Sequence, residues 1–103
     1  MTFDVQMMIN DNVATIQVTG DLDAATAGWF HDTINRAADA GAVELVIRAE
    51  RLSYLSSAGL RSLVFARQKM GEDVRVAVVG ASDLVARTIR LAGFDRSIDL
   101  VDA

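Results

Sequence analysis

Short apolar runs with the two-residue period of β-strands alternate along this sequence with segments of helical periodicity. The first two runs, Phe3–Ile9 and Val13–Thr19, both alternate apolar and polar residues, which is typical of strands with one buried face. Asn10-Asp11-Asn12 lies between them, and Asn and Asp tolerate the backbone angles of tight turns. The sequence therefore predicts an N-terminal hairpin.

Three helix–strand units are expected after the hairpin. The predicted helices run from Gly20–Asp23 to about Ala40, from the serine pair at 56–57 to Gly71, and from Ser82 to Gly93. The predicted strands are Val43–Ile47, Val74–Val79 and Ser97–Val101. The order β-β-α-β-α-β-α-β favours an α/β fold, with a single layer of mixed, mostly parallel sheet and helices packed on it. At 103 residues, the chain has room for one domain, expected to span 1–103.

Charge and composition exclude several classes of function. The ten basic residues are outnumbered by fourteen acidic ones, and the net charge of −4 argues against binding to nucleic acid or to an anionic membrane surface. No apolar run reaches the roughly 18 residues of a membrane span, so membrane insertion is not expected. The N-terminus lacks the pattern of a secretory signal and the chain has no cysteine, which together favour a cytoplasmic location.

The sequence offers no catalytic or metal-binding set. His31 is the single histidine, without partners for a metal site, and is expected on the exposed face of the first helix. Asp21 and Asp23 are expected to cap that helix rather than to hold a cation. Trp29 and Tyr54 are expected to pack in the core or at an interface. Neither a nucleophile–base pair nor a phosphate-binding loop is present, so we expect no enzyme activity and no cofactor.

The most informative segment is Arg48 to Gly59, where a polar stretch at 48–57, expected to be irregular, leads into the second helix. Ser56 and Ser57 fall at the start of this helix, where free N–H groups and the helix dipole favour an anion. A phosphate on Ser57 could be paired by Arg61, one helical turn further on. The simpler interpretation is that the serines only cap the helix and that Gly59 permits close packing.

Three motifs resemble the STAS family of anti-sigma factor antagonists. LVIRAERLSYLSSAGLRSL at 45–63 is similar to the family's central signature, in which Asp-Ser-Ser-Gly-Leu follows an apolar strand and a short loop. GDLDAATA at 20–27 resembles the entry to the first helix, and GASDLVARTIRLAGFDRSIDL at 80–100 resembles the closing helix and strand. The resemblance covers nearly the whole chain in the family's order, and it implies the STAS fold.

The resemblance also implies a function. In that family the unphosphorylated antagonist sequesters an anti-sigma factor, a serine kinase with a histidine-kinase-like ATPase fold. Phosphorylation releases the antagonist, and a phosphatase resets it. The implied phosphorylation site is Ser57. The implied partner-binding surface comprises Gly20, Asp21, Asp23, Ser56, Ser57, Ala58, Gly59 and Arg61. An alternative is a non-phosphorylated STAS subunit of an ABC-type lipid transport complex, which would bind an ATPase constitutively.

Two positions depart from the family motif. Ser56 replaces the motif Asp, and Ala58 replaces the second motif Ser. The neutral Ser56 removes like-charge repulsion with a phosphate on Ser57, but its own hydroxyl makes it the less favoured alternative site. Arg48 stands where many relatives have an Asp at the strand end, and we expect it to help neutralise the phosphate.

Overall fold

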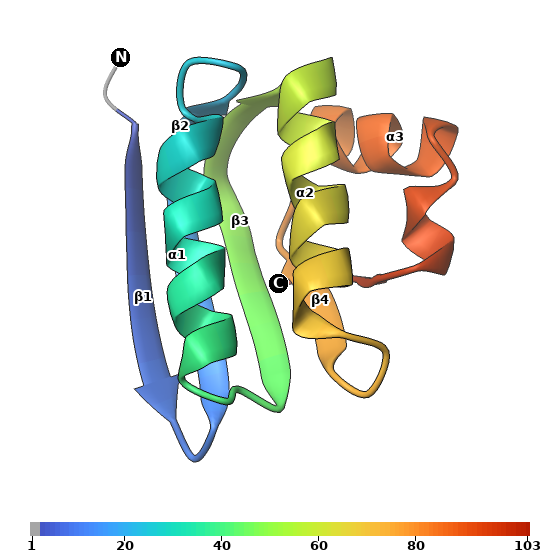
Figure 1. The fold of residues 1–103 in the computed structure, drawn as a ribbon. Helices are drawn as coiled ribbons and strands as arrows, with labels where there is room; N and C mark the ends of the chain where they lie inside the picture. The colour runs from blue at the N-terminus through green and yellow to red at the C-terminus, as the bar shows by residue number, and fades with distance from the viewer. Residues whose placement is uncertain (1–2) are drawn as a thin grey trace.

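The computed structural model describes residues 3–103, and its element order confirms the predicted β-β-α-β-α-β-α-β succession. The strands are β1 (Asp4–Asn10), β2 (Val13–Leu22), β3 (Glu44–Leu55), β4 (Arg75–Val79) and β5 (Asp99–Val101). The helices are α1 (Ala27–Asp39), α2 (Ser57–Met70) and α3 (Asp83–Leu91), and a short 3-10 helix, η1 (Phe94–Arg96), precedes β5. Figure 1 shows this path from the N-terminal hairpin to the closing strand.

The five strands form one sheet in the spatial order β1-β2-β3-β4-β5. Only the β1–β2 hairpin is antiparallel, and the remaining neighbours are parallel, so the predicted mixed sheet is confirmed. The hairpin turns at Asp11 and Asn12, whose φ angles of 51° and 64° lie in the left-handed region that Asn and Asp tolerate.

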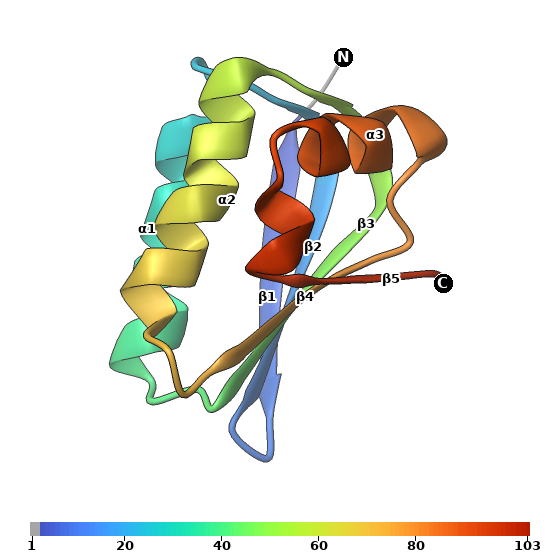
Figure 2. The same ribbon diagram turned by 90° about the vertical axis from the view of Figure 1, so that its right-hand side faces the viewer.

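One hydrophobic core joins the helices to the sheet. Helices α1 and α2 lie side by side over one face, and α3 lies near the end of the sheet at which β3 ends and α2 begins (Figures 1 and 2). Phe30, Ile34 and Ala37 recur at helical spacing along α1, and none of them has exposed surface. They pack with Ile16 and Leu45 from the sheet, so the helical periodicity correctly identified the buried face.

Two strands are longer than predicted, and the expectation of an irregular segment at 48–57 is wrong, because β3 occupies this segment as far as Leu55 and α2 begins at Ser57. β3 continues to Leu55, and β2 continues past Thr19 to Leu22. The register between them shifts between Gln17 and Thr19 and again after Gly20. The extra residues lie in β3, where they interrupt the two-residue alternation that marks a strand in a sequence, whereas the burial of β2 alternates without a break to Leu22.

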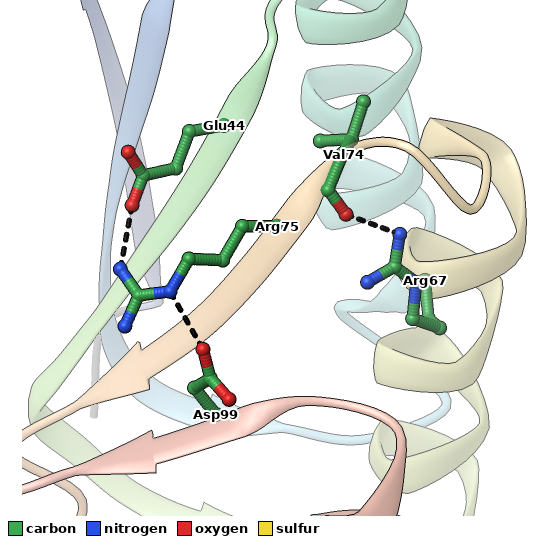
Figure 3. Close-up of polar contacts among 5 residues, drawn as sticks. All are labelled: Glu44, Arg67, Val74, Arg75 and Asp99. Atoms are coloured by element: carbon green, nitrogen blue, oxygen red, sulfur yellow. Dashed lines mark hydrogen bonds and ion pairs between the residues drawn. The ribbon is translucent and has the colours of Figure 1, made fainter.

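Ionic contacts and a helix C-cap lie at the opposite end of the sheet from the start of α2. Arg75 donates to the carboxylates of Glu44 and Asp99 at 2.7 and 2.6 Å, linking β4 to both of its neighbours (Figure 3). Arg67, near the end of α2, donates to the carbonyls of Gly71 and Val74. These contacts satisfy carbonyls after the helix, as basic side chains near a helix C-terminus commonly do.

Helix α2 approaches the sheet closely at Gly59, in its first turn. A Cβ atom added to Gly59 would lie 2.1 Å from the Leu22 carbonyl oxygen and 2.9 Å from Leu55 Cδ1. Since the nearest obstacle is backbone, no side-chain rotation can relieve the clash. Gly59 therefore allows α2 to begin directly against the ends of β2 and β3.

We predict that Gly59→Ala lowers the free energy of unfolding by about 3 kcal/mol, because the added methyl forces α2 away from β2. The measurement is equilibrium denaturation in urea. Gly28→Ala is the matched control, since Gly28 is an exposed residue of α1 at which an added Cβ atom would meet nothing within 4 Å. This control should raise stability by about 0.5–1 kcal/mol through helix propensity. Equal stability of the two variants would contradict the packing argument.

Candidate functional site

The carboxyl ends of β2 and β3 meet the start of α2 at one point. Leu22 and Leu55 are partners in the parallel register, and the Ser56 N–H donates to the Leu22 carbonyl at 3.1 Å. The loop that follows β2 therefore lies beside the first turn of α2, as Figure 1 shows. Ligand and partner sites of open parallel sheets commonly form at this end of the strands.

Ser56 is the N-cap of α2, which confirms the simpler interpretation for this serine. Its backbone is extended (φ −82°, ψ 176°), and its hydroxyl oxygen accepts the N–H of Gly59 at 3.1 Å. The same hydroxyl lies 3.4 Å from the Leu22 carbonyl, to which it can donate. The Ser56 side chain therefore both caps α2 and contacts the end of β2.

Ser57 differs from its neighbour in both exposure and bonding. It is the first residue of α2, its surface is exposed, and its hydroxyl makes no hydrogen bond with any residue in the range 3–103. The first backbone bond of this turn runs from the Leu60 N–H to the Ser56 carbonyl at 2.8 Å. The N–H groups of Ser57 and Ala58 precede that bond, so the positive end of the helix dipole lies at Ser57.

The β2–α1 segment supplies the second half of the site. Gly20 is buried at φ 95°, beside a register shift in β2, and Asp21 follows it within the strand. Asp21 therefore lies before the helix and does not cap it, so that expectation is wrong. Asp23 and Thr26 bond reciprocally: Asp23 Oδ1 accepts the Thr26 N–H at 3.2 Å, and Thr26 Oγ1 accepts the Asp23 N–H at 3.1 Å.

This reciprocal pair has the geometry of a capping box and forms the turn that leads into α1. The helix itself begins at Ala27, later than predicted, with Thr26 as its N-cap. Asp23 therefore caps the turn before α1 and not the helix itself, where capping was expected: its side chain also accepts the Ala25 N–H at 3.0 Å, and the first turn of α1 contains no acidic residue. Thr26 was missed in the sequence, although the spacing Asp-x-x-Thr was a signal for such a pair.

The two arginines considered as phosphate partners lie in different places. Arg61 is exposed, one helical turn beyond Ser57 on α2. Arg48 lies within β3, and the stretch of strand from Arg48 to Leu55 spans about 20 Å. Its guanidinium pairs with Glu50, and hydrogen bonding to Arg48 lowers the pKa of the Glu50 carboxyl. The expectation that Arg48 neutralises a phosphate at Ser57 is therefore wrong.

His31 lies between α1 and α2, and the expectation that it is exposed is wrong. Its ring is partly buried and stacks on Phe65 with the ring centroids 4.3 Å apart. Its Nε2 lies 3.0 Å from Ser62 Oγ, which in turn donates to the Ala58 carbonyl at 3.1 Å. Because the Ser62 proton is used for that carbonyl, the imidazole Nε2–H donates to Ser62, linking α1 to the first turn of α2.

The remaining expectations concern aromatic residues, metals and membranes. Trp29 and Tyr54 are 60% and 49% exposed, so neither is a core residue. Residues 3–103 bring together no three His, Asp or Glu side chains that could hold a metal ion. Within the same part of the chain, no helix is both long and apolar enough to cross a bilayer.

Comparison with known proteins shows what this chain is similar to in sequence and in fold. The sequence model of the STAS domain matches residues 4–103. The anti-sigma-F factor antagonist RsfB of Mycobacterium tuberculosis (strain CDC 1551 / Oshkosh) is 29% identical over 91 residues, which cover 88% of this chain and 75% of RsfB.

Solved structures agree with this match. An anti-sigma factor antagonist from Mycobacterium paratuberculosis superposes with a TM-score of 0.89 at 26% identity, covering 97% of this chain and 86% of that one. The Bacillus cell fate determinant SpoIIAA in its phosphorylated form gives a TM-score of 0.73 at 20% identity, covering 99% and 91% of the two chains. At that lower identity, the likeness concerns the fold.

The bonding of the two serines predicts different effects on stability. We expect Ser56→Ala to lower the free energy of unfolding by about 1 kcal/mol, because the Gly59 N–H loses its acceptor. Ser57→Ala should change it by less than about 0.5 kcal/mol, because no side-chain bond is lost. Ser82→Ala is the matched control for a capping loss, since Ser82 accepts the Val85 N–H at 3.2 Å in α3. Thermal or urea denaturation of the three variants checks the order, and a larger loss at Ser57 than at Ser56 would contradict it.

Proposed function

The chain belongs to the STAS domain family, and we propose that it is an anti-sigma factor antagonist whose binding surface is controlled by phosphorylation of Ser57. The names of its relatives support the first part, since RsfB and the M. paratuberculosis protein are both described as anti-sigma factor antagonists. The observation that carries the second part is the exposed, unbonded hydroxyl of Ser57 beside the occupied hydroxyl of Ser56.

The environment of Ser57 suits a modification that leaves the fold intact. A kinase must reach the hydroxyl without unfolding α2, and the Ser57 side chain is already exposed. Ser56 is less suitable, because its hydroxyl already accepts the Gly59 N–H, and phosphorylation would replace the proton that it can donate to the Leu22 carbonyl with a bulky anion beside that carbonyl. This difference supports Ser57 as the modified residue, while SpoIIAA illustrates that a protein of this fold can be phosphorylated.

A phosphate at Ser57 would be accommodated by the chain and repelled by a docked partner. It would carry a charge of roughly −1.5 to −2 at neutral pH. The N–H groups at the start of α2 and the nearby Arg61 would stabilise that charge locally. The local surface would nevertheless gain bulk and negative charge, in a chain whose net charge is already −4. A complex that buries this surface would therefore weaken.

The proposed docking surface combines the two segments that meet at the ends of β2 and β3. It comprises Gly20, Asp21 and Asp23 from the first segment, and Ser56, Ser57, Ala58, Gly59 and Arg61 from the second. Gly20 and Gly59 are buried, so their part is to shape the backbone, whereas Ser57 and Arg61 are exposed and available for contact. The proposed partner is an anti-sigma factor that is also a serine kinase of the histidine-kinase-like ATPase type. A phosphatase completes the cycle in the cytoplasm.

We predict opposite behaviour of two variants at Ser57 towards this partner. Ser57→Ala should bind the anti-sigma factor as tightly as the unmodified chain and should resist phosphorylation. Ser57→Asp should bind about a hundredfold more weakly, which corresponds to about 3 kcal/mol. Titration calorimetry with the purified anti-sigma factor provides the measurement. Equal affinities of the two variants would refute control by charge at this residue.

Phosphorylation itself is tested by intact-mass spectrometry after incubation with the candidate kinase and ATP. We expect the addition of one phosphate, mapped to Ser57 by fragmentation, in the unmodified chain and in Ser56→Ala. Ser57→Ala should gain none. Phosphate mapped to Ser56 would contradict the assignment of Ser57 as the modified residue. Absence of phosphate, together with stable co-purification of an ABC-type ATPase, would instead support a constitutive subunit of a lipid transport complex.

A further inference from the structure

The strand β1 forms one edge of the sheet and presents an unpaired row of backbone groups. It pairs with β2 through an unbroken register of seven residue pairs, from Asp4–Thr19 to Asn10–Val13. On its other side, no strand among residues 3–103 pairs with it. The outward N–H and C=O groups of a regular edge strand are a template for another strand.

Protein edge strands usually carry features that prevent such pairing, and β1 lacks them. Its sequence, DVQMMIN, contains no Lys, Arg or Pro, and its one charged residue, Asp4, lies at its start. Its register with β2 has no bulge, unlike that between β2 and β3. Every residue of β1 is at least partly exposed, with Met8 65% and Ile9 39% exposed. An edge of this length and polarity is suited to strand addition.

The opposite edge of the sheet shows the contrast. β5 has only three residues, and its first residue, Asp99, forms an ion pair with Arg75 at 2.6 Å (Figure 3). Short length and charge both discourage pairing with a further strand. The open, apolar edge of this sheet is therefore at β1.

A groove of mixed lining adjoins the open edge on the helix side. It lies between β1 and α1 and has a volume of 590 Å³. Its lining combines apolar Phe3, Val5 and Trp29 with polar Asp4, Asp32, Thr33 and Arg36. The rings of Phe3 and Trp29 stack with centroids 5.7 Å apart, yet Trp29 remains 60% exposed. The side chains of β1 that face the helices are thus left partly uncovered beside α1, where a neighbouring strand would shield them.

We propose that β1 pairs antiparallel with β1 of a second copy of this chain, joining the two sheets into one. The strand is self-complementary about its central residue, Met7. In the register that pairs all seven residues, Val5 faces the partner's Ile9, and Met7 faces the partner's Met7. On the other face, Asp4 faces the partner's Asn10, and Gln6 faces the partner's Met8.

This register explains why the second copy is the occupant. The helix-side face of the seam contains only apolar pairs, and the single acid of β1 meets a neutral amide rather than another acid. No like charges are directly opposed, although the chain as a whole is acidic. A two-fold axis through Met7 makes the arrangement a closed dimer, since each edge is used once.

The dimer is compatible with a free Ser57. In Figure 1, β1 lies on the far side of α1 from α2, and Ser57 begins α2. The seam therefore leaves the first turn of α2 uncovered in both copies. The dimer does not depend on phosphorylation, and Ser57→Ala should dimerise like the unmodified chain.

The first test is analytical ultracentrifugation over a range of protein concentrations. We expect the unmodified chain to show a concentration-dependent monomer–dimer equilibrium. Met8→Lys should raise the dimer dissociation constant by about tenfold or more, because it places two cations diagonally across the seam. Leu91→Lys is the matched control: Leu91 is 77% exposed on α3, and its replacement should leave the equilibrium unchanged. The proposal would be overturned by a chain that stays monomeric at all concentrations. It would also be overturned by a dimer whose dissociation constant is unchanged in Met8→Lys.

The second test determines the register of the two β1 strands from disulfide formation between introduced cysteines. The unmodified chain contains no cysteine that could interfere. Directly opposed residues have Cα atoms about 4.5–5.5 Å apart, within the range for a disulfide. Met7→Cys should therefore oxidise to a covalent dimer, and a mixture of Val5→Cys with Ile9→Cys should form the mixed dimer. Val5→Cys alone and Leu91→Cys should remain largely uncoupled. Coupling of Leu91→Cys as fast as Met7→Cys would refute the seam.

Discussion

The close contact between the start of α2 and the end of β2 determines where the functional residues lie. The Leu22 carbonyl accepts the Ser56 N–H at 3.1 Å, and the absence of a side chain at Gly59 lets the helix approach the same carbonyl. This contact fixes both the position and the rotation of α2. The outward direction of Ser57 and the place of Arg61 follow from it, because both lie on the same rigid helix.

The adjacent serines have separate tasks, which is what a reversible charge switch requires. A hydroxyl that stabilises the fold cannot be phosphorylated without a structural cost, whereas one without a partner can. Ser56 closes the end of α2 and touches the Leu22 carbonyl. The Ser57 hydroxyl makes neither of these contacts, and it lies where the helix dipole favours an anion. The replacement of the family's motif Asp by Ser56 keeps the capping function, since both residue types are good N-caps.

Docking and self-association would use surfaces in different directions. The proposed docking surface lies at the carboxyl ends of β2 and β3, whereas the open edge runs along β1. Between them lies α1, which is joined to α2 through the hydrogen bond from His31 to Ser62. Ser62 in turn donates to the Ala58 carbonyl in the first turn of α2. The packing of α1 against α2 therefore supports the proposed docking surface, although it adds no exposed group to that surface.

The sequence by itself determined the features that depend on neighbouring residues: the hairpin, the order of strands and helices, and the cap at Ser56. Strand periodicity and capping act over a few residues, so they can be recognised without knowledge of the rest of the chain. Only the tertiary structure decided the features that depend on distant partners. The extension of β3 requires pairing with β2 across bulges in β3 itself, the partial burial of His31 requires α2, and Arg48 is remote from Ser57 because its strand continues. Such contacts join residues far apart in the chain, and no local pattern encodes the distance between them.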